Sequence, residues 1–220
     1  MDNNKMIRTL IECGRQFYER GWMAGSAGNL SVKLGDGPVY AITPSGVNKG
    51  SLNPKELLTI RDGRVVGVKT SKNLRPSSDT IIHQTIYEAF PECGAVFHTH
   101  PIYSTLIAAL DGHPSRVRKV FPGWFEMMKG VGAEDDENAP ITILPNWTDV
   151  SLIARDLRNY LRQTKERVLP AVLLYNHGLI SWGRTPGLVR THMEVIEYVC
   201  QYLYLKRLAK GTPHKRPRAA

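Results

Sequence analysis

Three of the seven histidines stand where predicted strands end, and together they could hold a metal ion. His98 and His100 are two residues apart at the end of an apolar strand, so both imidazoles project from the same face. His177 ends a second strand and is followed by Gly178, which permits a close backbone approach. If the two strands are neighbours in one sheet, the three imidazoles meet. Three nitrogen ligands that leave a position open are typical of a catalytic zinc site.

The same histidines also allow a simpler interpretation, because an isolated His-x-His pair is a weak signal and a single histidine at a strand end is weaker. The other four are predicted to lie on helices or at the surface. His83 falls off the apolar stripe of its helix, so we expect it to face solvent. These four are His83, His113, His192 and His214.

Three turns rich in glycine, serine and asparagine could bind a phosphate group. Each offers short polar side chains and accessible backbone N–H groups, and the third precedes a predicted helix, whose positive N-terminal end attracts anions. Taken singly, each is an ordinary turn. Together with the histidines they point to a small phosphorylated substrate. The candidate residues are Gly28, Asn29, Ser45, Gly46, Ser77 and Ser78.

Helices and strands alternate along the chain, with hairpins as well as crossovers between the strands. Both kinds of connection favour an α/β sandwich over a purely parallel, doubly wound sheet. We expect one domain over residues 1–210 and a basic, disordered tail over 211–220. Predicted helices are 7–18, 81–90, 102–110, 150–161 and 186–208, and predicted strands are 30–32, 39–42, 58–60, 65–68, 94–98, 141–144, 171–175 and 179–182.

The chain of 220 residues carries a net charge of +9, which raises a nucleic-acid-binding protein as an alternative. However, six of its lysines and arginines lie in 206–220 with no acidic residue, which leaves +3 on the rest. The tail is therefore expected to be a solvated end, and no nucleic-acid partner is expected. There is no apolar run long enough for a membrane span, no signal-peptide pattern and no CxxC pair. We expect a cytoplasmic protein without a membrane partner.

Five short motifs follow one another along the chain: Gly28-Asn29-Leu30-Ser31, Thr43-Pro44-Ser45-Gly46, Pro76-Ser77-Ser78-Asp79, His98-Thr99-His100 and Asn176-His177-Gly178. Their order is that of the class II aldolase family, which the sequence resembles from about residue 6 to residue 208. The resemblance implies a class II aldolase-like three-layer α/β/α sandwich with a mixed, mostly antiparallel central sheet. It also implies one Zn²⁺ per subunit, held by the three histidines, and a homo-oligomer, commonly a tetramer, with active sites near subunit boundaries.

Within the family, the segment from Phe125 to Gly130 resembles the dehydratase branch, in which a residue like Glu126 is the catalytic acid and base. The implied reaction removes water from 5-methylthioribulose 1-phosphate and gives 2,3-diketo-5-methylthiopentyl 1-phosphate, a step of methionine salvage. Glu126 would take a proton and return it to the leaving hydroxyl. Lys129 would reach the substrate if the segment is helical, because i and i+3 share a face.

Two further activities of the family stay open, namely a sugar-phosphate aldolase and a pentulose-phosphate 4-epimerase. The aldolases carry a catalytic glutamate at the position of Asp79, whereas the epimerases, like this sequence, carry an aspartate there. The expected role of Asp79 is to complement the dipole of the helix that follows. Apolar neighbours favour a semi-buried position for Glu126.

The last helix is apolar around much of its circumference, and packing of subunits is one way to cover it.

Overall fold

The computed structural model describes residues 2–35, 37–68, 73–133, 139–163 and 168–211. The expected basic tail lies outside these ranges, except for Gly211, which ends the last helix. The helices are α1 (Asn3–Glu19), α2 (Thr80–Ala89), α3 (Ile102–Asp111), α4 (Val150–Gln163) and α5 (Pro186–Gly211). Four 3₁₀ helices are η1 (Ala24–Ser26), η2 (Lys49–Ser51), η3 (Pro54–Glu56) and η4 (Glu126–Val131).

The strands form one sheet in the order β4-β3-β2-β1-β5-β9-β8-β7-β6. Only β7 and β8 pair in parallel among the described strands, and every other pair is antiparallel. This confirms the mixed, mostly antiparallel sheet. The strands are β1 (Asn29–Lys33), β2 (Val39–Ile42), β3 (Leu58–Arg61), β4 (Arg64–Val68), β5 (Ala95–Thr99), β6 (Arg118–Val120), β7 (Ile141–Leu144), β8 (Ala171–Leu174) and β9 (Gly178–Gly183).

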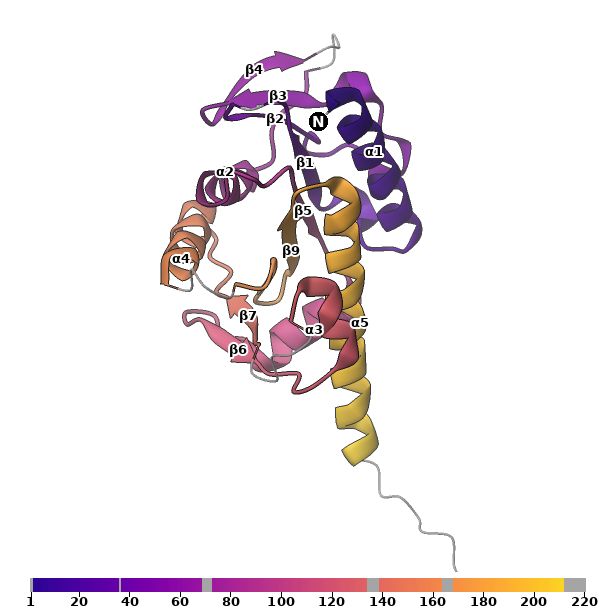
Figure 1. Cartoon of the computed structure of the whole chain (residues 1–220), viewed down its shortest axis with the longest axis vertical. Coiled ribbons are helices and arrows are strands. Elements are labelled where there is room, and N and C mark those ends of the chain that lie inside the picture. The colour runs from indigo at the N-terminus through magenta and orange to yellow at the C-terminus, as the bar shows by residue number, and fades with distance from the viewer. Residues whose placement is uncertain (1, 36, 69–72, 134–138, 164–167, 212–220) are drawn as a thin grey trace, which may run out of the picture.

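Helices cover both faces of the sheet, with α1, α3 and α5 on one side and α2 and α4 on the other (Figure 1). Alternation along β5 supplies both hydrophobic cores. Phe97 packs into the core beneath α1, α3 and α5, whereas its neighbour Val96 packs into the core beneath α2 and α4. Both side chains are fully buried. The central strands therefore lie between two apolar cores, and packing against both cores fixes the positions of the strand ends.

Local sequence signals account for several of the element boundaries. The Asp2 carboxylate accepts a hydrogen bond from the Asn4 backbone N–H at 2.9 Å and so caps α1. Asn53 and Glu56 form a capping box around η3. Thr185 caps α5 by accepting from the Leu188 N–H at 3.2 Å. Among the described residues, no helix has the length and hydropathy needed to cross a membrane.

β6 and η4 are among the elements that the sequence-based prediction lacks. β6 is a three-residue edge strand whose Arg118 and Lys119 side chains are exposed, so it lacks an apolar pattern. η4 is a short 3₁₀ turn packed against α5. Both segments take their conformation from tertiary packing and not from local propensity.

Candidate metal centre

The three predicted histidine ligands converge at the ends of β5 and of the β8–β9 hairpin. His98 Nε2 lies 3.0 Å from His100 Nε2 and 3.3 Å from His177 Nε2. One ligand nitrogen from each residue falls within 4.8 Å of the other two. The topology differs from the simple expectation, because β9 lies between β5 and β8. His177 reaches the site from the turn between β8 and β9.

The chemistry of the donor set suits a divalent cation. His98 Nδ1 lies 3.1 Å from the Leu179 carbonyl oxygen, which can only accept, so Nδ1 carries the hydrogen. In the neutral ring, Nε2 then keeps its lone pair for a ligand. Burial lowers the pKa of His98 to about 4 and that of His100 to about 3, and it also lowers the pKa of His177. The three rings are therefore neutral at pH 7, as metal ligands must be.

Asp79 brings a carboxylate to the histidine cluster. Its Oδ2 lies 3.9 Å from His98 Nε2 and accepts hydrogen bonds from Asn29 Nδ2 at 2.8 Å and Ser77 Oγ at 3.3 Å. Burial by itself would raise the pKa of Asp79, but His98 and the Asn29 bond outweigh burial and lower it. Asp79 is the N-cap residue of α2, yet its side chain makes no cap hydrogen bond. Asp79 therefore stands where its charge complements the dipole of α2, and its carboxylate also faces the histidine cluster.

The three phosphate-candidate turns lie side by side near the cluster. The backbone N–H of Ser45 donates to the Arg75 carbonyl at 2.9 Å, which joins the second turn to the segment before the third. The Asn29 amide donates to Ser77 Oγ at 3.2 Å, which joins the first turn to the third. Gly46 has φ +73° and Ser78 is exposed.

Gly28 is required where the first turn meets the cluster. Its φ is +74°, and a Cβ there would stand 2.6 Å from the His98 carbonyl oxygen and 2.8 Å from Met23 Cε. Any larger residue would push against the backbone of a predicted metal ligand.

Glu126 and Lys129 lie on η4, and the expected semi-buried position of Glu126 is wrong. The side chain of Glu126 is 72% exposed and that of Lys129 is 57% exposed. They form an ion pair of 2.6 Å, which confirms that the two residues share a face and which lowers the pKa of Glu126. Glu126 is not among the residues whose ligand atoms gather at the histidine cluster. The contact that the structure gives Glu126 is with Lys129 and not with the three histidines.

His83 is buried, so the expectation that it faces solvent is wrong, and His192 is a buried residue of helix α5. His83 is fully buried, with Nε2 2.5 Å from Asn29 Oδ1 and Nδ1 2.7 Å from Ser31 Oγ. His192 Nδ1 lies 2.9 Å from the Trp182 carbonyl. A sequence signal for His83 existed, since Asp79 and His83 are four residues apart on α2 and Asn29 and Ser31 are two apart on β1. Each pair shares a face of its element.

The fold agrees with comparisons to known proteins. Methylthioribulose-1-phosphate dehydratase of Microcystis aeruginosa is 32% identical over 196 residues, which cover 89% of this chain and 93% of that protein. The "Probable bifunctional methylthioribose-1-phosphate isomerase/methylthioribulose-1-phosphate dehydratase" of Nocardia farcinica is 34% identical over 85% of this chain. The match spans only 33% of that longer protein.

A solved structure, YgbL from Escherichia coli, superimposes with a TM-score of 0.75 at 26% identity, over 91% of this chain and 89% of that one. The family model described as "Class II Aldolase and Adducin N-terminal domain" matches residues 8–204. The chain therefore belongs to the class II aldolase and adducin N-terminal domain family.

Proposed function

We propose that the chain is a hydro-lyase that converts 5-methylthioribulose 1-phosphate to 2,3-diketo-5-methylthiopentyl 1-phosphate. The observation that carries the proposal is the three-histidine cluster, in a chain that matches a methylthioribulose-1-phosphate dehydratase over 93% of that protein's length. The reaction removes the proton on C3, next to the C2 ketone, and expels the C4 hydroxyl as water. The enol left behind becomes the second ketone.

His98, His100 and His177 would hold the metal, and we propose Zn²⁺ at one per subunit. A zinc ion at this position supplies Lewis-acid polarisation of the substrate carbonyl. The protein's part is to keep the three imidazoles neutral and converging. The Leu179 carbonyl fixes the ring of His98 through Nδ1.

The substrate phosphate would bind at the three turns near the cluster. Both hydrogens of the Asn29 amide already go to Asp79 and Ser77, so this side chain positions its neighbours in the absence of substrate. We assign the phosphate to backbone N–H groups and hydroxyls of these turns, at residues Gly28, Asn29, Ser45, Gly46, Ser77 and Ser78.

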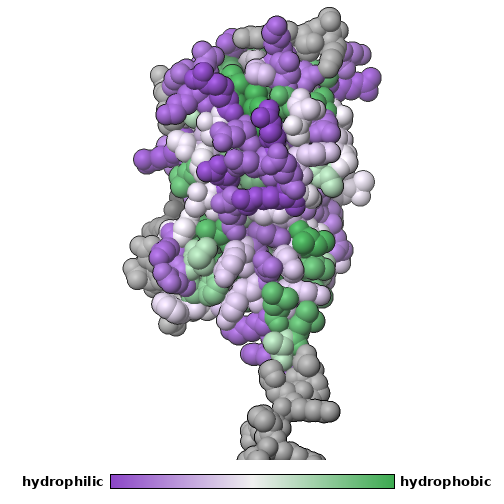
Figure 2. Space-filling view, turned by 90° about the vertical axis from the view of Figure 1, so that its right-hand side faces the viewer, coloured by the Kyte–Doolittle hydropathy of each residue, from purple (hydrophilic) through white to green (hydrophobic). Residues whose placement is uncertain are grey.

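We propose that Glu126 moves the proton, and that it does so in the site of a neighbouring subunit, with Lys129 at the substrate. The support is the exposure of both side chains and the apolar surface around them. Trp124, two residues before Glu126, is exposed. Phe125 stacks on Tyr198 and Tyr202 of α5. Figure 2 shows hydrophobic side chains gathered at the lower end of the molecule, near the end of α5. Leu205 and Leu208 there are exposed.

A homo-oligomer, which we propose to be a tetramer, would cover this surface. Exposed apolar side chains at the end of one long helix are costly in a monomer and typical of an interface. The arrangement would also complete the active site from two chains. We define this apolar interface surface by Trp124, Tyr198, Tyr202, Leu205 and Leu208.

We assign the reaction to methionine salvage in the cytoplasm. The name of the Nocardia farcinica relative joins an isomerase that forms methylthioribulose 1-phosphate to the dehydratase that uses it. Cys13, Cys93 and Cys200 are buried and unpaired, which suits a reducing compartment.

An aldolase or a 4-epimerase is the second candidate, because Asp79 places a carboxylate 3.9 Å from His98. The deciding experiment incubates the purified, metal-loaded protein with 5-methylthioribulose 1-phosphate and follows the products by NMR and mass spectrometry. We expect the diketo product formed by loss of one water. An aldehyde with a smaller phosphorylated fragment would establish an aldolase instead, and a C4 epimer would establish an epimerase.

A further inference from the structure

A buried row of hydrogen bonds leads from helix α2 to the histidine cluster. Tyr87 Oη lies 2.8 Å from Ser31 Oγ, and Ser31 Oγ lies 2.7 Å from His83 Nδ1. His83 Nε2 lies 2.5 Å from Asn29 Oδ1. Asn29 Nδ2 then lies 2.8 Å from Asp79 Oδ2. Five side chains from β1 and α2 therefore form one continuous row.

The chemistry of the groups fixes the direction of every bond in this row. The ionised carboxylate of Asp79 can only accept, so Asn29 turns its NH₂ to Asp79 and its oxygen to His83. That oxygen can only accept, so His83 Nε2 carries the hydrogen. In a neutral imidazole, Nδ1 then accepts the one hydrogen of Ser31 Oγ at 2.7 Å, in preference to the more distant Val96 carbonyl at 3.3 Å, and Ser31 Oγ in turn accepts from Tyr87. All donors point toward Asp79.

His83 is held in the neutral form by its surroundings. The side chain is fully buried, and burial lowers its pKa to about 4, although the charge of Asp79 acts in the opposite direction. A doubly protonated ring would place a second N–H against Ser31 and reverse the bond there. The neutral ring keeps the row intact at pH 7.

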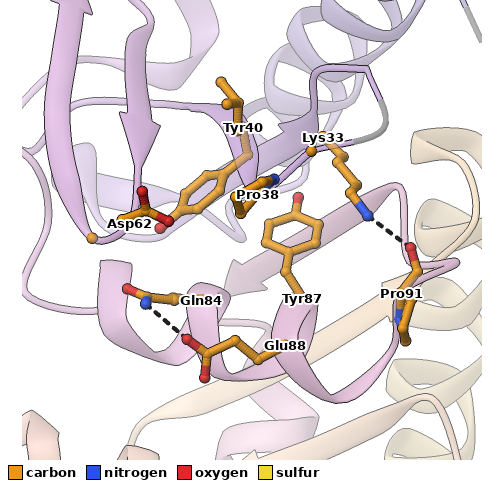
Figure 3. A pocket seen from close by; sticks show the side chains of 11 residues that line it. Lys33, Pro38, Tyr40, Asp62, Gln84, Tyr87, Glu88 and Pro91 are labelled. Atoms are coloured by element: carbon orange, nitrogen blue, oxygen red, sulfur yellow. Dashed lines mark hydrogen bonds between the residues drawn. The ribbon is translucent and has the colours of Figure 1, made fainter.

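The row ends beside a metal ligand at one end and at a cavity at the other. Asn29 pairs with His98 in the β1–β5 register. At the far end, Tyr87 and Tyr40 line a cavity of about 190 Å³, with ring centroids 5.0 Å apart (Figure 3). The cavity lies at the outer end of the row. His83 joins Ser31 to Asn29 and so connects that end to the cluster.

We propose that His83 is a positioning residue, which fixes the orientation of the Asn29 amide and thereby holds the Asp79 carboxylate beside His98. Without the His83 donor, the Asn29 oxygen loses its partner and the amide can rotate away from Asp79. His83 touches none of the three predicted metal ligands, so it acts on them through its contact with Asn29. The proposal rests on the proposed function only for its kinetic test.

The tautomer of His83 tests the proposal without any activity. The experiment records ¹⁵N–¹H spectra of the histidine side chains in metal-free protein at pH 6, 7 and 8, and the His83→Gln variant assigns the signal that disappears. We expect a neutral ring with the hydrogen on Nε2 at each pH. A ring with the hydrogen on Nδ1, or a ring that is protonated at pH 6, would overturn the proposal.

Two substitutions at His83 test its consequence. In His83→Gln the side-chain amide can still donate to Asn29, whereas His83→Leu fills similar space without a donor. We expect kcat of the Leu variant to fall about tenfold, the effect of losing one hydrogen bond to a polar partner, with KM changed less. The Gln variant should recover most of kcat, and bound metal should equal that of the wild type.

Tyr87→Phe is the matched control, because it removes only the outermost donor and leaves the Asn29 bond in place. We expect its kcat to stay near that of the wild type. Equal loss in the Leu and Gln variants would show that His83 contributes packing alone and would overturn the proposal. If the wild-type protein fails to dehydrate the substrate, the proposed function fails, and the tautomer experiment still decides the role of His83.

Discussion

Asn29 on β1 lies directly across from His98 on β5, so the sheet register places the Asn29 amide next to a predicted metal ligand. The same register sets Gly28 against the backbone carbonyl of His98. Antiparallel pairing, fixed by the buried faces of both strands, therefore determines the geometry of the site. The consequences can be tested one by one.

Gly28→Ala should lower both stability and metal affinity. The left-handed backbone alone costs a non-glycine residue roughly 1–2 kcal/mol, and the new Cβ also meets the His98 carbonyl at 2.6 Å. Gly35→Ala is the matched control, because Gly35 has φ +69° with no atom within 4 Å of an added Cβ. Urea denaturation and zinc titration of both variants provide the measurement. Equal metal affinity in the two variants would show that the contact with His98 is unimportant.

The metal-free protein should lose stability as the pH falls from about 6.5 toward 4. The folded chain keeps His83 and His98 neutral, with pKa values lowered to about 4 by burial, whereas the unfolded chain protonates them near pH 6.5. Protons therefore bind preferentially to the unfolded chain below pH 6.5. Each such histidine lowers the free energy of unfolding by about 1.4 kcal/mol per pH unit in this range.

Urea denaturation in the presence of a chelator at pH 7.5, 6 and 5 measures this effect. The His83→Gln variant, which lacks one of the buried histidines, should show a shallower dependence on pH. A free energy of unfolding that is constant or rises between pH 6.5 and 5 would contradict the neutral, buried state of these rings.

Glu126→Gln should abolish most turnover while leaving bound metal unchanged, because Glu126 is exposed and apart from the histidine cluster. If Glu126 serves a neighbouring subunit, oligomers mixed from Glu126→Gln and His177→Ala chains should regain activity, since some sites then combine an intact Glu126 with intact histidines. The assay unfolds, mixes and refolds the two variants, with each variant refolded alone as the control. No recovery in mixed oligomers would place Glu126 in its own subunit's site or outside the mechanism.

Leu205→Lys should weaken the oligomer, because it places a charge on the apolar interface surface. Val66→Lys on β4 is the control, since Val66 is 54% exposed and Leu205 is 47% exposed. Sedimentation velocity across a range of concentrations provides the measurement. The prediction fails if Leu205→Lys sediments like the wild type, or if wild-type chains sediment as monomers.

Much of the fold could be predicted from local patterns. The helices around Ile82 and Ile153 follow a 3.6-residue apolar period, and both are buried in one core. The order of the strands could not be predicted, because it depends on contacts between distant segments. For this reason the position of His177, in the turn just before β9 and beside β5, is a relation that no local period encodes.

The polar part of the site shows the same limit. The predicted His98, His100 and His177 do converge, but the burial of His83 escaped prediction because the helix face that it shares with Asp79 is polar and yet faces Asn29 and Ser31. An apolar stripe identifies a buried face only when the core beneath it is apolar. A buried hydrogen-bonded network gives no hydrophobic signal.

The central claim is that three neutral histidines hold the metal on which dehydration depends. Its most direct test titrates the metal-free protein with Zn²⁺ and measures bound metal and formation of the diketo product in the same samples, alongside His98→Ala, His100→Ala and His177→Ala. We expect metal and turnover to rise together to one ion per subunit in the wild type, with both strongly reduced in each variant. Full turnover in the chelated protein, or wild-type metal content in all three variants, would contradict the account.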